Sequence, residues 1–176
     1  MANPPNDPAV VPGLSHVDAE GRPQLVDVSP KTASFRQASA EGWVTFAPDV
    51  YARLRGTEGQ TKKGPVLTVA QLAGIMAAKR TSDLIPLCHP LPLEKIALRL
   101  DWQEESCAVR IEATVAVHHL TGVEMEALTA VSVAALTVYD MTKALSHDIR
   151  IGPIQLVAKQ GGKQDFQRQD FQHTEP

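Results

Sequence analysis

The stretch "TGVEMEALTAVSVAALTVYDMTKAL", residues 121–145, predicts one long helix that is buried on more than one side. The thirteen residues between Glu126 and Asp140 carry no charge, and small or apolar side chains occur nearly all round the predicted helix. A helix that packs on a single sheet needs only one apolar stripe. We therefore expect the sheet to cover one side and a second copy of the chain to cover another. The abundance of Val and Thr also suits a buried strand, but the length of the stretch favours a helix.

Charged side chains lie only at the two ends of this stretch, and they comprise Glu124, Glu126, Asp140 and Lys143. Asp140 and Lys143 are three residues apart and share a helix face, which suits an ion pair near the helix end as well as a catalytic pair. Thr121 and Glu124 fit a capping box at the helix start. Over one continuous helix, Glu126 and Asp140 are separated by about 21 Å. One small pocket can use both ends only if helices from two copies of the chain meet there.

The composition is that of an ordinary globular protein, and it excludes several classes of function. The chain has 176 residues, of which 43% are hydrophobic and 21% are charged, and its net charge is −3. It is not basic enough for a general nucleic-acid binder, and no apolar run approaches the roughly 20 residues that span a membrane. Cys88 and Cys107 lack the spacing of a metal finger and suit reduced thiols. We expect a cytoplasmic protein without nucleic-acid or membrane partners.

The two ends of the chain differ in composition from the middle. Residues 1–13 are rich in proline and predict a disordered tail without the apolar region of a signal peptide. Residues 161–176 are polar and predict a flexible tail. Residues 14–160 lie between them without an internal repeat, and we expect a single catalytic domain there.

Hydrophobic periodicity predicts the order of helices and strands in this domain. Residues 68–80 read as a helix that begins with a capping box at Thr68 and Gln71 and presents Val69, Leu72, Ala73 and Met76 on one apolar stripe. The strand candidates are residues 24–29, 42–48, 93–102, 108–117 and 148–159, the last with a bulge at 152–153, and residues 49–56 read as a short helix. From residue 42 onward, the order predicts an α+β fold of the ferredoxin-like βαββαβ type, with an antiparallel sheet and both long helices on one face.

The segment "TSDLIPLCHPLPL", residues 81–93, predicts a stiff loop because its three prolines prevent a helix. His89 in this loop suits a general acid or base, or a hydrogen-bond donor to a phosphate. It equally suits a half-buried histidine that bonds to the backbone. Cys88 is more typical of a packed thiol than of a nucleophile. Adjacent side chains point apart, which argues against a metal ion shared by Cys88 and His89.

Lysine and glycine residues mark two further loops. Residues 57–64, "TEGQTKKG", form a loop whose lysines either face solvent or close over a bound polyphosphate. The run Gly161-Gly162-Lys163 offers backbone N–H groups and a cation to an anion, although such a run is common.

Four of these segments together resemble the MoaC family, the cyclic pyranopterin monophosphate synthases of molybdenum cofactor biosynthesis. They are "LVDVSPKTASFRQA", the "KKG" loop, "MAAKRTSDLIPLCHPLPL" and "TGVEMEALTAVSVAALTVYDMTKA", and the resemblance runs from about Leu14 to Lys163. It implies a ferredoxin-like homohexamer, built as a trimer of dimers, with active sites at subunit interfaces. It also implies a phosphorus–oxygen lyase that converts 3′,8-cyclo-7,8-dihydro-GTP to cyclic pyranopterin monophosphate and releases pyrophosphate. No cofactor is implied, although Mg²⁺ can accompany the triphosphate.

The resemblance also implies roles for individual residues. Asp140 and Lys143 of "YDMTK", with Lys63 before its glycine, match the family's catalytic residues. The segments that bind the substrate in the family match Leu87, Cys88, His89, Glu124, Met125 and Glu126, and its phosphate-facing basic residues match Arg36, Lys79 and Lys163. The chain departs from the family pattern in two places, with Ser34 where a threonine is expected and "GGKQDF" in place of a GGKSG run.

This assignment predicts a specific acid–base arrangement. Asp140 would act as a base, and Lys63 and Lys143 as acids or charge stabilisers. Closely packed lysines lower one another's pKa, so we expect these two amines to titrate nearer to neutrality.

Two other functions fit parts of the sequence. One is a metal-dependent nucleotide hydrolase, with Cys88, His89, Glu124 and Glu126 as ligands. The other is a regulatory module that binds a small molecule across a dimer without catalysis. We expect the synthase and no metal site.

Overall fold

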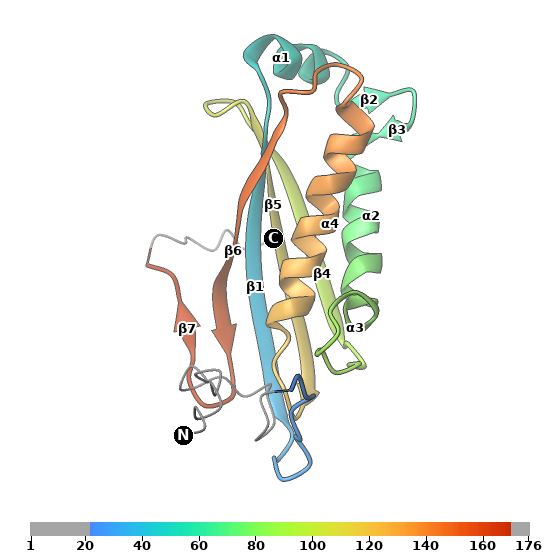
Figure 1. The fold of residues 1–176 in the computed structure, drawn as a ribbon. Coiled ribbons are helices and arrows are strands. Elements are labelled where there is room, and N and C mark those ends of the chain that lie inside the picture. Colours follow the sequence, from blue (N-terminus) through green and yellow to red (C-terminus); the bar gives the residue numbers. More distant parts are fainter. Residues whose placement is uncertain (1–21, 170–176) are drawn as a thin grey trace, which may run out of the picture.

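The computed structural model describes residues 22–169 and contains a twisted antiparallel sheet with its two long helices on one face (Figure 1). In chain order, the elements are β1 (Ser34–Thr45), α1 (Pro48–Gly56), β2 (Gln60–Thr61), β3 (Gly64–Pro65), α2 (Val66–Ala78), α3 (Thr81–Leu84), β4 (Lys95–Gln103), β5 (Ala108–His119), α4 (Glu124–Thr142), β6 (Arg150–Gln160) and β7 (Phe166–Gln167). None of the helices described is long and apolar enough to cross a membrane.

The strand order of the main sheet is β4-β5-β1-β6-β7, with antiparallel pairing throughout. The elements β1, α2, β4, β5, α4 and β6 follow one another as strand, helix, strand, strand, helix and strand. The first strand therefore lies between the third and the fourth, which is the ferredoxin-like arrangement. The predicted α+β fold is confirmed. β2 and β3 form a separate small hairpin beside the end of α4 (Figure 1).

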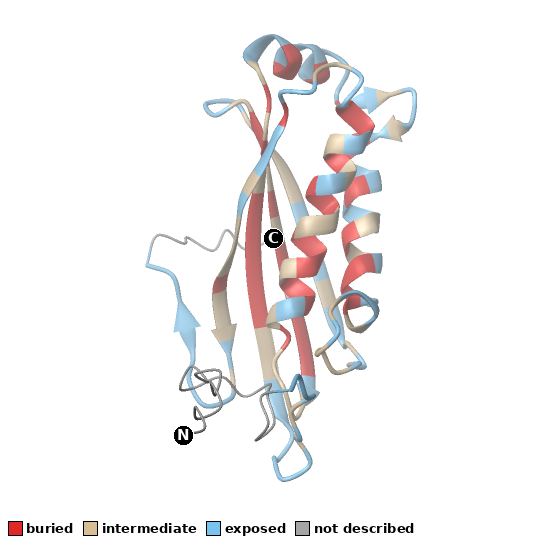
Figure 2. Ribbon diagram, in the orientation of Figure 1, coloured by how far each residue is buried: buried red, intermediate tan, exposed pale blue. Residues whose placement is uncertain are grey.

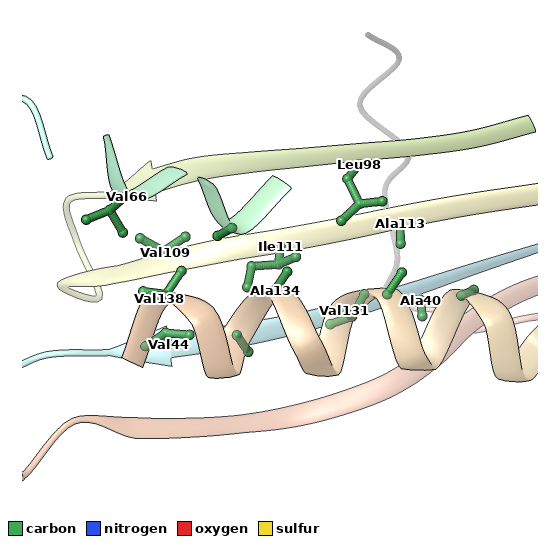
Figure 3. Close-up of a cluster of buried hydrophobic side chains, with 14 of the residues drawn as sticks. Ala40, Val44, Val66, Leu98, Val109, Ile111, Ala113, Val131, Ala134 and Val138 are labelled. Carbon is green, nitrogen blue, oxygen red and sulfur yellow. The ribbon is translucent and has the colours of Figure 1, made fainter. Parts of the chain in front are cut away.

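Small and β-branched side chains form the core between α4 and the sheet (Figure 3). Alternate residues of β1 and β5 point toward the helix, because side chains alternate between the two faces of a strand. The labelled members on β1 and β5 are Ala40, Val44, Val109, Ile111 and Ala113, and those on α4 are Val131, Ala134 and Val138, each at most 1% exposed. In Figure 2 β1 and β5 are coloured as buried over much of their length, and buried residues recur along α2 and α4.

Helix α2 covers a second side of α4, and Gly74 brings the two helices together. A Cβ built at Gly74 would collide with Leu98 Cδ2 and would lie 2.8 Å from the carbonyl oxygen of Ala130 and 3.2 Å from Ala134 Cβ. The backbones can approach this closely only because position 74 has no side chain. The prediction that α4 is buried on more than one side is thus confirmed, but α2 of the same chain supplies the second side.

The apolar stripe predicted for α2 faces outward. Val69, Leu72 and Met76 are 37%, 58% and 47% exposed, whereas Val66, Ala70, Gly74, Ala77 and Ala78 are buried. The small residues face α4 because large side chains would hold the two helices apart. Periodicity identified an apolar face here, but the close approach of α4 decided which face of α2 is buried.

Both predicted capping boxes are wrong. α2 begins at Val66, so Thr68 lies inside the helix, and Gln71 Nε2 instead donates to the carbonyl oxygen of Leu98 at 2.7 Å. This bond satisfies an acceptor on β4 at the edge of the sheet. α4 has Val123 as its N-cap without a side-chain cap, and the Glu124 carboxylate pairs with Lys159.

The predicted strand at residues 24–29 is also wrong, and β1 is longer than expected. Residues 24–28 carry no strand pairing, because this segment lies over the loop of His89, whose Nε2 is 3.0 Å from the carbonyl oxygen of Val26. β1 begins at Ser34 instead of residue 42. Within β1, residues 37–41 (QASAE) alternate polar residues with alanines, which gives a weak hydrophobic signal.

The irregularity predicted at residues 152–153 is confirmed. The pairing of β1 with β6 shifts register between Gly42 and Val44, opposite a cis Gly152-Pro153 peptide. Residues 1–13 lie outside the described residues. Of the predicted flexible tail, the described part includes β7, which pairs with Ala158 and Lys159 of β6, and the flexibility of residues 161–176 stays a prediction.

The Gly74 contact predicts a large effect of a small substitution. Gly74→Ala should lower the free energy of unfolding by roughly 1–3 kcal/mol, because the new methyl group overpacks the contact of α2 with α4. Gly56→Ala is the matched control, since a Cβ at Gly56 meets nothing within 4 Å. Urea denaturation midpoints measure both variants. Equal midpoints for the two would contradict this account of the packing.

Candidate functional site

A pocket of about 510 Å³ lies at the start of α4, and we call it the acid pocket. It is lined by Val26, Val28, Lys31, Ile85, Leu87, Cys88, His89, Leu91, Thr121, Gly122, Glu124, Met125 and Glu126. Three separate segments meet here: residues 26–31, the proline-rich loop after α3, and the first turn of α4. The loop is stiff because of its prolines, and Cys88 N donates to the carbonyl oxygen of Ile85 at 3.0 Å. All six substrate-binding candidates of the Leu87 and Glu124 segments line this pocket.

His89 is half-buried and bonds to the backbone. Its Nε2 lies 3.0 Å from the carbonyl oxygen of Val26. A carbonyl oxygen only accepts hydrogen bonds, so Nε2 carries the proton in the neutral ring and Nδ1 is the acceptor. The histidine therefore holds residues 24–29 over the pocket and keeps one ring nitrogen for a ligand.

Glu126 is the buried acid of this pocket, with only 4% of its surface exposed. Burial raises its pKa to about 7, and the charge of Glu124 acts in the same direction. Burial and the charge of Glu126 together raise the pKa of the Cys88 thiol. Glu126 can therefore give or take a proton near neutral pH, whereas Cys88 stays a protonated thiol and a weak nucleophile.

A second pocket of about 460 Å³ adjoins the first, and we call it the cationic pocket. Its basic side chains are Lys31, Arg36, Lys159 and Lys163, and its one carboxylate is Glu124. The two pockets share Lys31, Thr121, Gly122 and Glu124, so they adjoin, and we call the two together the hollow. Arg36 Nε donates to the carbonyl oxygen of His119 at 3.4 Å, and Lys159 Nζ lies 3.3 Å from Glu124 Oε1. Four cations facing one carboxylate suit an anionic ligand.

The glycine run at residues 161–162 lines the cationic pocket, but one of its N–H groups is already used. Gly161 N donates to Asp165 Oδ1 at 2.8 Å. The predicted capture of an anion by this run therefore has at most the remaining backbone groups and Lys163 available.

The other end of α4 carries Lys63, Asp140 and Lys143, which we call the lysine–aspartate cluster. Lys63 Nζ lies 2.6 Å from Asp140 Oδ2 and 2.8 Å from the carbonyl oxygen of Asp140, and Lys143 Nζ lies 2.8 Å from Asp140 Oδ1. All three side chains are about half exposed. The structure therefore brings the three predicted catalytic residues together, with a surplus of one positive charge.

The electrostatics of this cluster differ from the prediction. Hydrogen bonds from Lys143 and Lys63 lower the pKa of Asp140 to about 2, and Asp140 in turn raises the pKa of Lys143. At Lys143 the neighbouring carboxylate has the larger effect, so the pKa of this lysine rises instead of falling. In this arrangement Asp140 is a permanent anion and Lys143 a permanent cation at neutral pH, so the expected shift of the lysines toward neutrality is wrong for Lys143.

The predicted site residues thus fall into two groups at opposite ends of one helix. α4 is continuous from Glu124 to Thr142, so the expected separation of Glu126 and Asp140 by about 21 Å applies within one chain. Lys79 forms the C-cap of α2, is exposed and lines neither pocket. Lys31 and Lys159 were not among the residues predicted from the sequence. Their positions in the sequence could have indicated them, because Lys31 closely follows "VDVS" and Lys159 comes shortly before the glycine run at residues 161–162.

The hydrolase alternative requires a metal-binding cluster. Within residues 22–169, no group of three or more His, Cys, Asp or Glu side chains is arranged to hold a metal ion. Cys88, His89, Glu124 and Glu126 line one pocket but do not converge on a common point, and this geometry disfavours the hydrolase.

The sequence model described as the MoaC family matches residues 25–162, which include the lysine–aspartate cluster and every residue that lines the two pockets except Lys163. The chain belongs to the MoaC family. A curated relative from Dinoroseobacter shibae, named cyclic pyranopterin monophosphate synthase, is 56% identical over 151 residues, which cover 86% of this chain and 94% of the relative. A relative of the same name from Xanthomonas oryzae pv. oryzae is 52% identical over 87% of this chain and 92% of its own length.

A member from Drosophila melanogaster, named molybdenum cofactor biosynthesis protein 1, is also 52% identical over 160 residues. These residues cover 91% of this chain but only 28% of the fly protein. The chain therefore matches more than nine-tenths of the length of these two bacterial relatives and only a part of the fly protein.

The raised pKa of Glu126 predicts a pH-dependent stability. Because the folded-state pKa lies above the ordinary value of 4.5, the folded protein loses stability as the pH rises from about 4.5 to about 7, by up to about 3 kcal/mol. Glu126→Gln should remove this loss. Urea midpoints should show the variant more stable than the parent at about pH 8 and similar at about pH 4.5. Glu105→Gln, in the exposed β4–β5 turn, is the control, and an identical pH profile in both variants would refute the assignment.

Proposed function

We propose that this chain converts 3′,8-cyclo-7,8-dihydro-GTP to cyclic pyranopterin monophosphate and releases pyrophosphate. Membership of the MoaC family and the names of the bacterial relatives support this activity. The single observation that carries the proposal is the hollow, in which the buried acid Glu126 lines one pocket and four cations line the adjoining pocket. A ligand with a heterocycle at one end and a triphosphate at the other could place its heterocycle in the acid pocket and its triphosphate in the cationic pocket.

The acid pocket supplies proton transfer to the heterocycle. Rearrangement of a purine into a pyranopterin opens and closes rings, and each step moves a proton. Glu126 exchanges protons near neutral pH because its burial raises its pKa. His89 presents Nδ1 to the ligand while Nε2 stays bonded to Val26. Apolar side chains of Leu87 and Met125 line the same pocket and exclude water from the ring.

The cationic pocket supplies charge stabilisation for the triphosphate. Closure of the cyclic phosphate requires attack of a ribose hydroxyl on the α-phosphate and expulsion of pyrophosphate. Negative charge develops on the leaving oxygens, and fixed cations stabilise that charge in the transition state. In this pocket the leaving pyrophosphate is stabilised by Arg36, Lys159 and Lys163. Lys79 lines neither pocket, so within one chain it does not take part in this stabilisation.

We infer that the lysine–aspartate cluster joins the hollow from a second copy of the chain. Within one chain, about 21 Å of helix separates Asp140 from Glu126, which is too far for one substrate atom to meet both. An antiparallel pairing of two copies would set the end of one α4 beside the start of the other. In such a site Lys63 and Lys143 bring cations to the phosphates, and Asp140 holds the two ammonium groups in place.

The outer face of the helical layer supports such an assembly. Leu72 and Met76 on α2 and Leu136 on α4 are 58%, 47% and 57% exposed. Large apolar side chains in such a patch favour association. We propose that the chain assembles as a homohexamer, a trimer of dimers, and acts in the cytoplasm.

We propose that the reaction needs no resident cofactor and that Mg²⁺ enters only with the triphosphate of the substrate. The acid–base groups and the cations named above account for proton transfer and charge stabilisation. Turnover that persists after exhaustive chelation would support this assignment, and loss of turnover that one transition metal restores would favour the hydrolase alternative.

Turnover of the cyclised nucleotide tests the proposed activity directly. The parent protein should release pyrophosphate and form a pterin product, and Lys63→Ala should lower kcat by about 100-fold or more, because cations at developing charge contribute on this scale. Lys62→Ala is the matched control, since this neighbouring lysine lies outside the lysine–aspartate cluster, and it should keep the parental rate. Binding of substrate by the parent without any product would favour a regulatory module.

Mixing two inactive variants tests the shared site. Lys63→Ala and Glu126→Gln should each be nearly inactive alone. If each site takes Lys63 from one copy and Glu126 from another, refolding an equal mixture should restore about a quarter of the parental activity, because half of the pairs contain one intact site. No recovery in a mixture shown to exchange subunits would place both residues in a site built by one chain.

A further inference from the structure

Lys63 belongs to a structural element that cannot hold it in place alone. It occupies the turn of the β2–β3 hairpin, in which each strand has two residues. An isolated two-stranded hairpin is at best marginally stable in water. Lys63 nevertheless places its ammonium group between the side chain and the carbonyl oxygen of Asp140. Contacts outside the two strands must therefore fix the backbone of the turn.

Thr61 fixes the turn from within. Its hydroxyl donates to the carbonyl oxygen of Gly64 at 3.0 Å and accepts from the backbone N–H of Lys63 at 3.1 Å. One side chain thus ties both sides of the turn and orients the residue that carries the ammonium group. A methyl group in place of the hydroxyl would remove both bonds while keeping the shape of the side chain.

Trp102 supports the base of the same hairpin. Gly59 has φ of +72° and lies against the indole ring, so that a Cβ built there would be 2.9 Å from Trp102 Cζ2. The backbone of Gly59 also donates to the carbonyl oxygen of Leu54 at 2.8 Å and accepts from Val66 N at 3.0 Å. Only glycine combines this backbone conformation with such a close approach to a ring. The indole is therefore the surface on which the hairpin begins.

The indole ring is itself held on its other sides. Tyr51 packs edge-on against it with ring centroids 5.7 Å apart, and the Arg55 guanidinium lies 5.7 Å from its centroid. Glu104, beyond the end of the same strand, anchors Arg55 through a 2.7 Å ion pair. The end of β4 and helix α1 thus form a rigid base, and the hairpin extends from it toward α4.

We propose that Trp102 and Thr61 are positioning residues for Lys63, because the indole fixes the base of the β2–β3 hairpin and the hydroxyl fixes its turn. The inference rests on the proposed role of Lys63 in the reaction. Neither side chain touches the substrate hollow, so each acts through the place that it gives to the ammonium group. A displacement of a reacting group by about 1 Å can lower a rate by roughly 100-fold.

The kinetic test uses Thr61→Val and Trp102→Ala in the full-length protein with the cyclised nucleotide as substrate. Each should lower kcat by about tenfold or more, with little change in KM, because the pockets that bind the ligand are untouched. Thr61→Ser keeps the hydroxyl and should keep the rate. Glu105→Ala lies in the exposed β4–β5 turn beyond Trp102 and should also match the parent.

A double-mutant cycle separates positioning from general damage. In the Lys63→Ala background, Thr61→Val and Trp102→Ala should cause no further loss of the residual kcat, because their effect passes through Lys63. Equal losses in both backgrounds would overturn the proposal. So would parental kcat in both variants while Lys63→Ala is inactive, an outcome that leaves the proposed function intact. A fully active Lys63→Ala variant would instead remove Lys63 from the proposed chemistry and overturn this inference with it.

Hydrogen exchange gives a readout that does not depend on activity. Both variants should exchange faster in peptides covering residues 57–65 and unchanged in β5 and α4. Thr61→Ser should keep parental exchange throughout. Unchanged exchange at residues 57–65 would refute the anchoring itself, and faster exchange spread over the sheet would assign Trp102 to core stability alone.

Discussion

The close contact of α4 with α2 is the constraint on which the rest of the structure depends. Gly74 lets the backbone of α2 reach Ala130 and Ala134, so that α4 is enclosed by the sheet on one side and by α2 on another. Enclosed in this way, α4 stays helical over 19 residues without a side-chain cap. Its length then fixes the distance between the two groups of functional residues. The packing of small side chains thus sets the geometry of the chemistry.

The two ends of α4 give the same functional group opposite properties. Glu126 is buried, and its pKa rises to about 7, whereas Asp140 is exposed between two lysines and its pKa falls to about 2. Desolvation dominates at one end and hydrogen bonding to cations at the other. A carboxyl group that exchanges protons and a carboxylate that stays charged suit different steps of one reaction. This contrast supports the synthase that we propose for this member of the MoaC family.

The functional residues lie on elements of very different stability. The sheet and the two long helices carry the pockets, while Lys63 lies on a minimal hairpin beside them (Figure 1). Such a hairpin needs an external support, and the aromatic residues between α1 and the end of β4 provide one. The outer face of α2 keeps large apolar side chains exposed in the single chain. The exposed apolar face of α2 fits the proposal that the complete site forms when copies of the chain associate.

The sequence alone determined the order of the six main elements (β1, α2, β4, β5, α4 and β6), the ferredoxin-like topology, the long buried helix and the family, because periodicity and long motifs are local properties of the chain. It also identified the residues that meet in the lysine–aspartate cluster. Only the tertiary structure decided which face of α2 is buried, that Gln71 bonds to β4 instead of capping its helix, and that Lys31 and Lys159 join the cationic pocket. Each of these depends on a neighbour distant in sequence. The pKa values of Glu126 and Lys143 do so as well, since burial and charge act through space.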